Sequence, residues 1–454
     1  MARIPLLAHT TPDAVLAYRD GQAISARQFV ADARALATLL PTGTHVLNVC
    51  TDRYHFTVGF AACLIAGKTS LLPPTHVPEV ICHLKAFAPD ACCLTDDADC
   101  SIDLPLLRYR AQSAPPDTDW QVPAIDGERR VAYVFTSGST GAPVPHAKAW
   151  GPLVAAVAVE AQRLGFLEGR PRVIVATVPP QHMYGFESSV LVALQSGQAF
   201  CAERPFYPAD IAATLGAVPR PRMLVSTPVH LRALLAAGIA LPAVDLVLCA
   251  TAPLEPALAT EVEKRLGAPL LEIYGSTETG QIASRRTTAG TEWQLWPDVS
   301  LSVRDDRTWA AGGHVGAAMP LGDVVEILPE GRFLLRGRTQ DMVNIAGKRS
   351  SLAYLNHQLT AIPGVVDAFF YLPEEAARRS VTGTVRLGAL VVAPALTAAE
   401  IIRELRTRMD PVFLPRPLLL VEQIPRNSTG KLALTMLKSL TERAARIAQA
   451  AGAG

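Results

Sequence analysis

The sequence of 454 residues has almost no net charge, since 42 lysines and arginines face 41 aspartates and glutamates. That balance gives no electrostatic reason to expect nucleic acid or an anionic membrane as the main partner. The N-terminus lacks the apolar core of a signal peptide, and the longest weakly polar stretches fall short of the about 18 residues that a membrane-spanning helix needs. We therefore expect a cytoplasmic protein with no membrane span.

Several site signatures are missing as well. The eight cysteines form no C-x-x-C pair, which argues against a zinc site and favours buried thiols. The chain contains neither a Walker A loop nor the G-x-S-x-G elbow of a serine hydrolase. With 49% hydrophobic and 18% charged residues, the composition is that of a globular protein.

Helical patterns alternate with strand-like apolar runs, for example a helical pattern at 27–40 and a strand-like run at 44–50. Such alternation predicts an α/β fold built in layers, with ligand loops at the strand ends. A polar stretch at 337–348 precedes a smaller α+β pattern that includes a helical segment at 398–408. We expect a large N-terminal domain of layered α/β subdomains over residues 1–338 and a small C-terminal domain over 339–454.

The first informative segment covers residues 131–143 (VAYVFTSGSTGAP). A short apolar strand runs into small residues, where Gly138 and Gly141 let the backbone approach a ligand closely. The hydroxyls of the same run suit polyphosphate binding. Taken alone, a Ser/Thr/Gly-rich surface turn explains this segment equally well.

A second segment, residues 271–280 (LEIYGSTETG), ends another predicted strand. It offers an aromatic ring that could stack on a base, hydroxyls for phosphate and a carboxylate for Mg²⁺. Together the two segments resemble the adenylate-forming superfamily, which includes acyl-CoA and aryl-CoA ligases, adenylation domains of peptide synthetases and luciferase. Five further segments match in order: 179–185 (PPQHMYG), 250–254 (ATAPL), 322–323 (GD), 337–341 (GRTQD) and 425–431 (PRNSTGK).

The resemblance implies a set of roles. The ATP site would comprise Thr136, Ser137, Gly138, Ser139, Thr140, Gly141, Lys148, Ala250, Thr251, Ala252, Tyr274, Gly275, Ser276, Asp323 and Arg338. Catalysis would fall to Lys431, Glu278, Thr277 and His182, with Glu278 as the Mg²⁺ ligand and Gln340 as the hinge. The acid pocket would take His182, Tyr184, Phe186, Glu187, Gly280 and Ile282.

For some of these residues an ordinary structural role is the alternative. Asp323 could be a turn residue, because Gly-Asp is common turn chemistry. His182 could be a satisfied histidine at a strand end, and Glu187 a structural ion-pair partner. Lys431 would otherwise be a solvated lysine, but a cation is what the charge growing on transferred phosphoryl oxygens requires.

The sequence departs from the family pattern at three places. Val144 stands where most relatives carry a lysine, and we expect Lys148, on a looser loop, to supply the missing cation. Gln340 occupies the hinge position, and residues 350–356 lack the usual acidic side chains. The α-ammonium-binding aspartate of amino-acid-activating relatives is missing near Tyr184, which disfavours an α-amino acid as substrate.

These observations predict an ATP- and Mg²⁺-dependent acid–thiol ligase. It would convert a carboxylic acid, with aryl and medium-chain or fatty acids favoured, to acyl-AMP and pyrophosphate. The acyl group would pass to CoA or to the phosphopantetheine arm of a carrier protein acting in trans. The run around Tyr184 is most similar to ligases of aryl-polyene or fatty-acid-type pathways. The alternative is a non-catalytic nucleotide-binding or scaffolding homologue.

Overall fold

The computed structural model describes residues 2–110, 120–137, 143–305, 307–338, 342–345, 348–372 and 387–424. The chain divides into two compact units, of which the first comprises residues 1–300 and 310–319 and the second 301–309 and 320–454. The predicted mixed α/β architecture is confirmed. Gln340, the expected hinge, lies outside the described residues, and the domain boundary at 338 stays a prediction.

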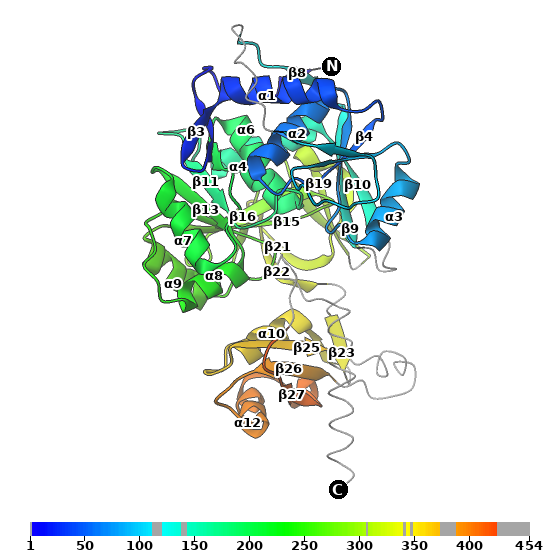
Figure 1. Ribbon diagram of the computed structural model, residues 1–454. Helices are drawn as coiled ribbons and strands as arrows, with labels where there is room; N and C mark the ends of the chain where they lie inside the picture. The colour runs from blue at the N-terminus through cyan, green and yellow to red at the C-terminus, as the bar shows by residue number, and fades with distance from the viewer. Residues whose placement is uncertain are drawn as a thin grey trace. The chain divides into compact units, whose positions relative to one another are not determined.

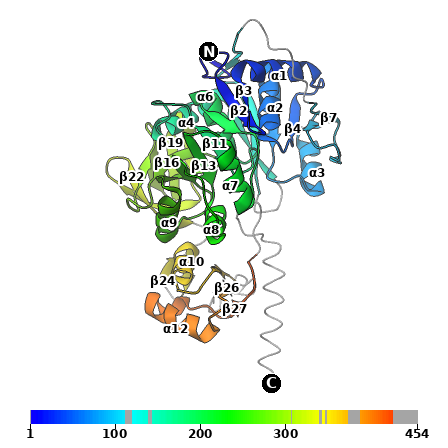
Figure 2. The same cartoon turned by 60° about the vertical axis from the view of Figure 1, so that its left-hand side comes forward.

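The first unit contains a six-stranded sheet in the order β10-β9-β5-β4-β6-β7. These strands are β4 (His45–Asn48), β5 (Thr69–Leu72), β6 (Cys92–Thr95), β7 (Leu106–Arg108), β9 (Arg130–Ser137) and β10 (Pro143–Ala149). Neighbouring strands are parallel, except that β10 runs antiparallel to β9. Helix α1 (Ala26–Leu39) precedes β4, whereas α2 (Arg53–Ile65) and α3 (Pro78–Phe87) connect β4 to β5 and β5 to β6. Figure 2 shows α1 and α2 beside β4.

Helix α2 begins earlier than its apolar run, which starts at Thr57. Its N-cap is Asp52, whose side chain accepts a hydrogen bond of 3.0 Å from the backbone N–H of His55. That cap satisfies a donor of the first turn and so extends the helix back to Arg53. Almost every residue of α2 is buried, as expected for a helix enclosed between layers.

A second, larger sheet of the first unit has the order β17-β16-β15-β14-β13-β11-β12-β2-β3. These strands are β2 (Val15–Arg19), β3 (Gln22–Ser25), β11 (Val173–Ala176), β12 (Ala199–Cys201), β13 (Arg222–Ser226), β14 (Leu246–Cys249), β15 (Leu270–Ser276), β16 (Gly280–Arg285) and β17 (Trp293–Leu295). The strands from β15 through β14, β13, β11 and β12 to β2 are parallel. Their carboxyl ends therefore share one edge, where ligands bind in open α/β sheets.

Two groups of helices accompany this sheet. Figure 1 shows α7 (Pro208–Ala217), α8 (Pro228–Ala236) and α9 (Pro256–Leu266) gathered on one side of it, in green. Their apolar residues form one core with β11, β13 and β14. The other group is α4 (Trp150–Arg163), α5 (Met183–Gly185), the π-helix η1 (Phe186–Leu191) and α6 (Val192–Ser196). The remaining elements of the first unit are β1 (Arg3–Pro5), β8 (Ala124–Asp126) and the 3-10 helix η2 (Gly313–Val315). The residues of β18 (Ser300–Arg304), β19 (Arg307–Gly312) and β20 (Gly316–Pro320) are divided between the two units.

The second unit contains two antiparallel hairpins followed by a small α+β core. The hairpins are β21 (Asp323–Leu328) with β22 (Arg332–Arg338), and β23 (Met342–Ile345) with β24 (Lys348–Ser351). The core combines α10 (Leu352–Thr360), β25 (Asp367–Tyr371), β26 (Gly388–Val392), α12 (Ala398–Arg408), the 3-10 helix η3 (Pro411–Phe413) and β27 (Leu418–Leu420). Within the described ranges, no helix combines the length and apolar character needed to cross a membrane.

Candidate functional site

The predicted phosphate loop connects β9 to β10. Thr136 pairs with Val144, and Ser137 pairs with Pro143, at the end of this hairpin. The loop residues Gly138, Ser139, Thr140 and Gly141 lie outside the described residues, as does the side chain of Ser137. The structure does place the hydroxyl of the residue before it: Thr136 Oγ1 lies 2.9 Å from His146 Nε2.

His146 connects the two segments that the sequence singled out. Its Nε2 lies 2.9 Å from Thr136 Oγ1 on β9 and 3.6 Å from Glu278 Oε1. Burial lowers the pKa of His146, while the carboxylate of Glu278 acts in the opposite direction. Sequence reasoning missed this residue, although Val144, His146 and Lys148 alternate along β10 and so share one face of the strand.

Lys148 also comes from β10, so the expected looser loop is wrong at this position. The residue pairs with Ala132 in the antiparallel ladder, directly before a shift in the register at Ala149. Its ammonium donates to the carbonyl of Thr277 and, at 3.2 Å, to that of Glu278. Burial lowers the pKa of Lys148, and Glu187 and Glu278 oppose that shift. Lys148 therefore holds the backbone of the segment that carries the predicted Mg²⁺ ligand.

The turn between β15 and β16 carries Thr277 and Glu278. Ser276 and Thr279 close it by exchanging hydrogen bonds of 3.2 Å between each backbone N–H and the other hydroxyl. At Gly275 a side chain has no room, because a Cβ would lie 2.2 Å from the carbonyl oxygen of Gly280. The close approach of the two backbone segments therefore explains why the sequence motif has a glycine at this position.

Tyr274, the predicted adenine neighbour, lies on β15 just before that turn. Its ring is centred 5.6 Å from the ring of Trp293 on β17. The guanidinium of Arg285 lies over the ring of Trp293, 4.4 Å from its centroid. A cation over an indole ring is a favourable contact, so this group orders the strand beside Tyr274.

The predicted adenine-side loop, Ala250 to Ala252, follows directly after β14. Thr251 has a φ of +82°, a conformation that is an outlier for a β-branched residue. Its Oγ1 is buried without a hydrogen-bond partner. Strain and an unsatisfied hydroxyl in one residue of a strand-end loop are features that cluster at ligand sites.

The predicted acid-pocket segment forms a compact turn after β11. His182 is the N-cap of α5, and its carbonyl accepts a hydrogen bond of 2.7 Å from the N–H of Phe186. The hydroxyl of Tyr184 donates toward the carbonyls of Ser226 (3.2 Å) and Leu248 (3.0 Å). Tyr184 thus lies across the ends of β13 and β14, while Phe186 is fully buried.

Glu187 and Gly280 meet in the interior of the first unit. Glu187 is 2% exposed, and burial raises its pKa to about 7, against the attraction of Lys148. A Cβ on Gly280 would lie 2.9 Å from Glu187 Oε1. Ile282, on the same strand as Gly280, is completely buried. The structure therefore brings Lys148, Glu187 and Gly280 into one neighbourhood.

Arg53, which the sequence analysis did not predict, holds the backbone that precedes the acid-pocket segment. The guanidinium of Arg53 is completely buried and donates to Ser189 Oγ (2.5 Å) and to the carbonyls of Ala176 (2.9 Å) and Val178 (3.0 Å). Two of these acceptors lie immediately before the run that contains His182. Arg53 is therefore a positioning residue for that run.

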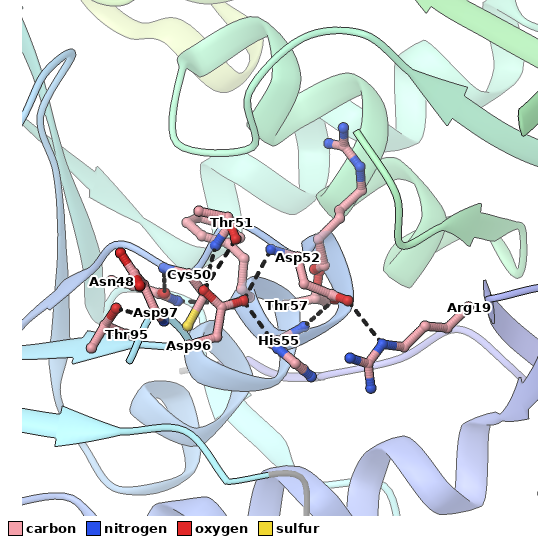
Figure 3. A network of polar contacts seen from close by, with 12 residues as sticks. Arg19, Asn48, Cys50, Thr51, Asp52, His55, Thr57, Thr95, Asp96 and Asp97 are labelled. Atoms are coloured by element: carbon pink, nitrogen blue, oxygen red, sulfur yellow. Dashed lines mark hydrogen bonds and ion pairs between the residues drawn. The ribbon is translucent and has the colours of Figure 1, made fainter. Parts of the chain in front are cut away.

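The first turn of α2, which carries Arg53, is itself anchored by the polar network in Figure 3. Arg19 Nε donates to Asp52 at 2.8 Å, and Asp96 pairs with His55 at 3.0 Å. Asp96 also accepts from the N–H groups of Thr51 (2.8 Å) and Asp52 (3.0 Å). These bonds hold the pKa of Asp96 at about 2, against the effect of its burial.

Asp323 and Arg338 lie in the second unit. They are directly paired at the open end of the β21–β22 hairpin. Their sequence separation therefore places their backbones side by side. Lys431 lies outside the described residues, so its role stays a prediction.

The carboxylate of Glu278 was expected to bind Mg²⁺. Among the residues that the structure describes, no three histidine, cysteine or acidic side chains form a ready metal cluster. A single carboxylate nevertheless fits Mg²⁺, which usually keeps several waters and takes substrate phosphates as its other ligands. The donor set suits a metal that arrives with a nucleotide.

The chain matches a known protein family and named relatives. Residues 7–337 match the family described as AMP-binding enzyme. The chain is 30% identical over 288 residues to a 4-coumarate–CoA ligase of Rhodobacter capsulatus, covering 63% of this chain and 70% of the relative. It is 25% identical over 350 residues to a 4-chlorobenzoate–CoA ligase of an Arthrobacter species, covering 68% and 65%.

Two solved structures share the fold over nearly the whole chain. One is o-succinylbenzoate CoA synthetase from Bacillus subtilis with an acyl-adenylate intermediate, with a TM-score of 0.80, 16% identity and coverage of 96% of this chain and 99% of that one. The other is ATP-bound MatB from Rhodopseudomonas palustris, with a TM-score of 0.79, 18% identity and coverage of 95% and 96%.

Proposed function

The chain belongs to the family of AMP-binding enzymes, and from this premise we propose that it is an ATP-dependent acid–thiol ligase. The acid is an aryl or medium-chain to fatty acid, and the thiol is that of CoA or of a carrier protein's phosphopantetheine arm. The observation that carries the proposal is the Thr136–His146–Glu278 bridge, which joins the phosphate-loop strand to the predicted Mg²⁺ ligand. Relatives named as CoA ligases support it.

In the first step, an oxygen of the acid's carboxylate attacks the α-phosphorus of ATP. A P–O bond forms, the bond to pyrophosphate breaks, and acyl-AMP results. Positioning and charge stabilisation carry most of such a transfer. Thr136 and the loop after it would hold phosphates, Thr277 the α-phosphate, and Tyr274 and the strained Thr251 loop the adenine.

Mg²⁺, when bound with ATP, would neutralise charge on the phosphate oxygens. Glu278 would hold it, together with oxygens of the nucleotide and water. Lys148 contributes by fixing the backbone that presents Glu278. Lys431 would stabilise the negative charge that develops on the departing pyrophosphate.

In the second step, the sulfur of the thiol attacks the carbonyl carbon of acyl-AMP. A thioester forms, the C–O bond to AMP breaks, and the thiol proton passes to solvent. Asp323 and Arg338, paired at the end of their hairpin, would hold the ribose near the hinge at Gln340. A rotation about this hinge between the two steps would be a lid-type motion of the kind that often sets turnover.

An exchange assay tests the proposal. The protein is incubated with ATP, labelled pyrophosphate and a panel of carboxylic acids, and label entering ATP is measured. We expect exchange with at least one aryl or medium-chain acid. The active acid is then offered with free CoA and with purified carrier proteins, and the thioester identifies the acceptor. Nucleotide binding with no exchange for any acid would favour the non-catalytic alternative.

A further inference from the structure

A group of buried polar side chains in the first unit contains several oxygen atoms without a hydrogen-bond partner. Glu160 from α4, Glu187 from η1 and Gln281 from β16 are 0%, 2% and 4% exposed. Both carboxyl oxygens of Glu160, Oε1 of Glu187 and Oε1 of Gln281 are buried without a hydrogen-bond partner. Unsatisfied polar atoms in an interior cost free energy, so such a concentration requires an explanation.

Two unpartnered atoms of the first unit lie beside Gly280. A Cβ built on Gly280 would lie 2.9 Å from Glu187 Oε1 and 3.7 Å from the Nε2 of His314, which is also unpartnered. Gln281 uses its amide nitrogen on Ser188 Oγ, at 2.8 Å, which leaves its oxygen unused. The acceptors come from four elements of one unit, and the π-helix that carries Glu187 is a distortion often found at functional sites.

A purely structural ion pair does not account for the group. Lys148 attracts Glu187, but its ammonium gives its hydrogen bonds to the carbonyls of Thr277 and Glu278. Ser188 and Gln281 lower the pKa of Glu160, and the like-charged Glu187 raises it. Burial raises the pKa of Glu160 to about 8, so this carboxyl keeps its proton at neutral pH and still offers an acceptor oxygen.

We propose that Glu160, Glu187 and Gln281, with His314, form a subsite that binds a hydrogen-bond donor on the carbon skeleton of the acid, a hydroxyl or an amino group. The inference rests on the proposed function and specifies its substrate class. Two glutamates would repel the carboxylate of the acid, so the donor lies on the part of the skeleton away from it. A plain hydrocarbon end would leave the acceptors unsatisfied, which is how such sites reject analogues.

Three matched aryl acids test the subsite in the exchange assay, with a para hydroxyl, a para amino group or a para methyl group of similar size. We expect kcat/KM for the better donor acid to exceed that for the methyl acid by about tenfold or more. The hydroxyl and amino arms decide which donor the subsite takes. A methyl acid that is activated equally well or better overturns the inference and leaves the ligase function standing, whereas exchange with no acid overturns the ligase function itself.

Two isosteric variants assign the effect to these residues. In Glu160→Gln and Glu187→Gln, kcat/KM for the donor acid should fall at least about fivefold, and by a clearly larger factor than kcat/KM for the methyl acid. Glu263→Gln is the matched control, because Glu263 pairs with Arg286 elsewhere on the first unit. If both subsite variants lower the rates with all three acids equally, the assignment is wrong. Thermal unfolding identifies any variant that fails to fold, and the wild-type comparison stands without it.

Discussion

Replacing Arg53 by methionine tests how the acid-pocket segment is held. The change keeps a long apolar side chain but removes three hydrogen bonds, to Ser189 and to the carbonyls of Ala176 and Val178. A hydrogen bond to a charged group contributes about 1.5–3 kcal/mol. Part of that loss is offset because a guanidinium no longer has to be buried, a burial that already lowers the pKa of Arg53 to about 10.

Three such bonds would sum to about 4.5–9 kcal/mol, and because of that offset we expect Arg53→Met to lower the free energy of unfolding by about 3–5 kcal/mol. Because the freed carbonyls precede the His182 run, KM for the acid should rise more than KM for ATP. Urea denaturation measures the first effect, and exchange kinetics at varied acid and ATP concentrations measure the second.

Arg129 provides a matched control. It too makes three hydrogen bonds, in its case to the backbone carbonyls of Cys63, Leu64 and Lys68 at the other end of α2. Arg129→Met should lower stability and leave KM for the acid unchanged. The positioning role would be refuted if Arg129→Met raised KM for the acid as much as Arg53→Met does, or if Arg53→Met changed both constants equally.

Three other predictions follow from the site. Lys148→Met should raise KM for ATP about tenfold or more, because the backbone of Thr277 and Glu278 loses two charged hydrogen bonds; initial-rate kinetics check this. Lys431→Ala should abolish acyl-AMP formation and affect thioester formation from supplied acyl-AMP much less, which separate half-reaction assays measure. Glu160 has a folded-state pKa of about 8, above its ordinary value of 4.5, so its contribution to stability is complete below about pH 4.5 and lost as pH rises through 8. Glu160→Gln should therefore flatten the fall in Tm between pH 5 and 8.

Each of these predictions has a distinct contrary result. An unchanged KM for ATP in Lys148→Met would show that the strand-borne ammonium does not support nucleotide binding. Equal losses in both half-reactions would contradict the role assigned to Lys431. A Tm that falls with pH as steeply in Glu160→Gln as in the wild type would place the responsible titration elsewhere.

The fold predictions were most accurate where the local sequence pattern includes the signals that begin or end an element. The helix expected at 398–408 is α12 at the same residues, because Thr397 and Glu400 form a capping box visible in the sequence. The strand ends that carry the 250–252 and 274–278 motifs were also readable, since apolar runs and turn residues mark them. Helix α2 begins ahead of its apolar run because its cap, Asp52, precedes that run.

Long-range contacts were beyond the reach of such patterns. Arg53 finds its acceptors 123, 125 and 136 residues away, and no local periodicity predicts that a buried arginine will meet Ala176, Val178 and Ser189. Only the pairing of β10 with β9 shows that His146 and Lys148 lie on a strand and not in a loop. The crowding of Glu160, Glu187 and Gln281 depends on three elements meeting in space, which a spacing argument cannot supply.

The two arginines that hold the ends of α2 have different consequences for how the first unit unfolds. Arg53 joins α2, which accompanies the first sheet, to β11 and η1 of the second, and its N–H also bonds to the carbonyl of Ala202 after β12. Arg129 secures the opposite end of the same helix. Separating the two sheets would break the buried bonds of Arg53 together, so we expect the sheets to open in one cooperative transition, with the amides of α2 among the slowest to exchange hydrogen.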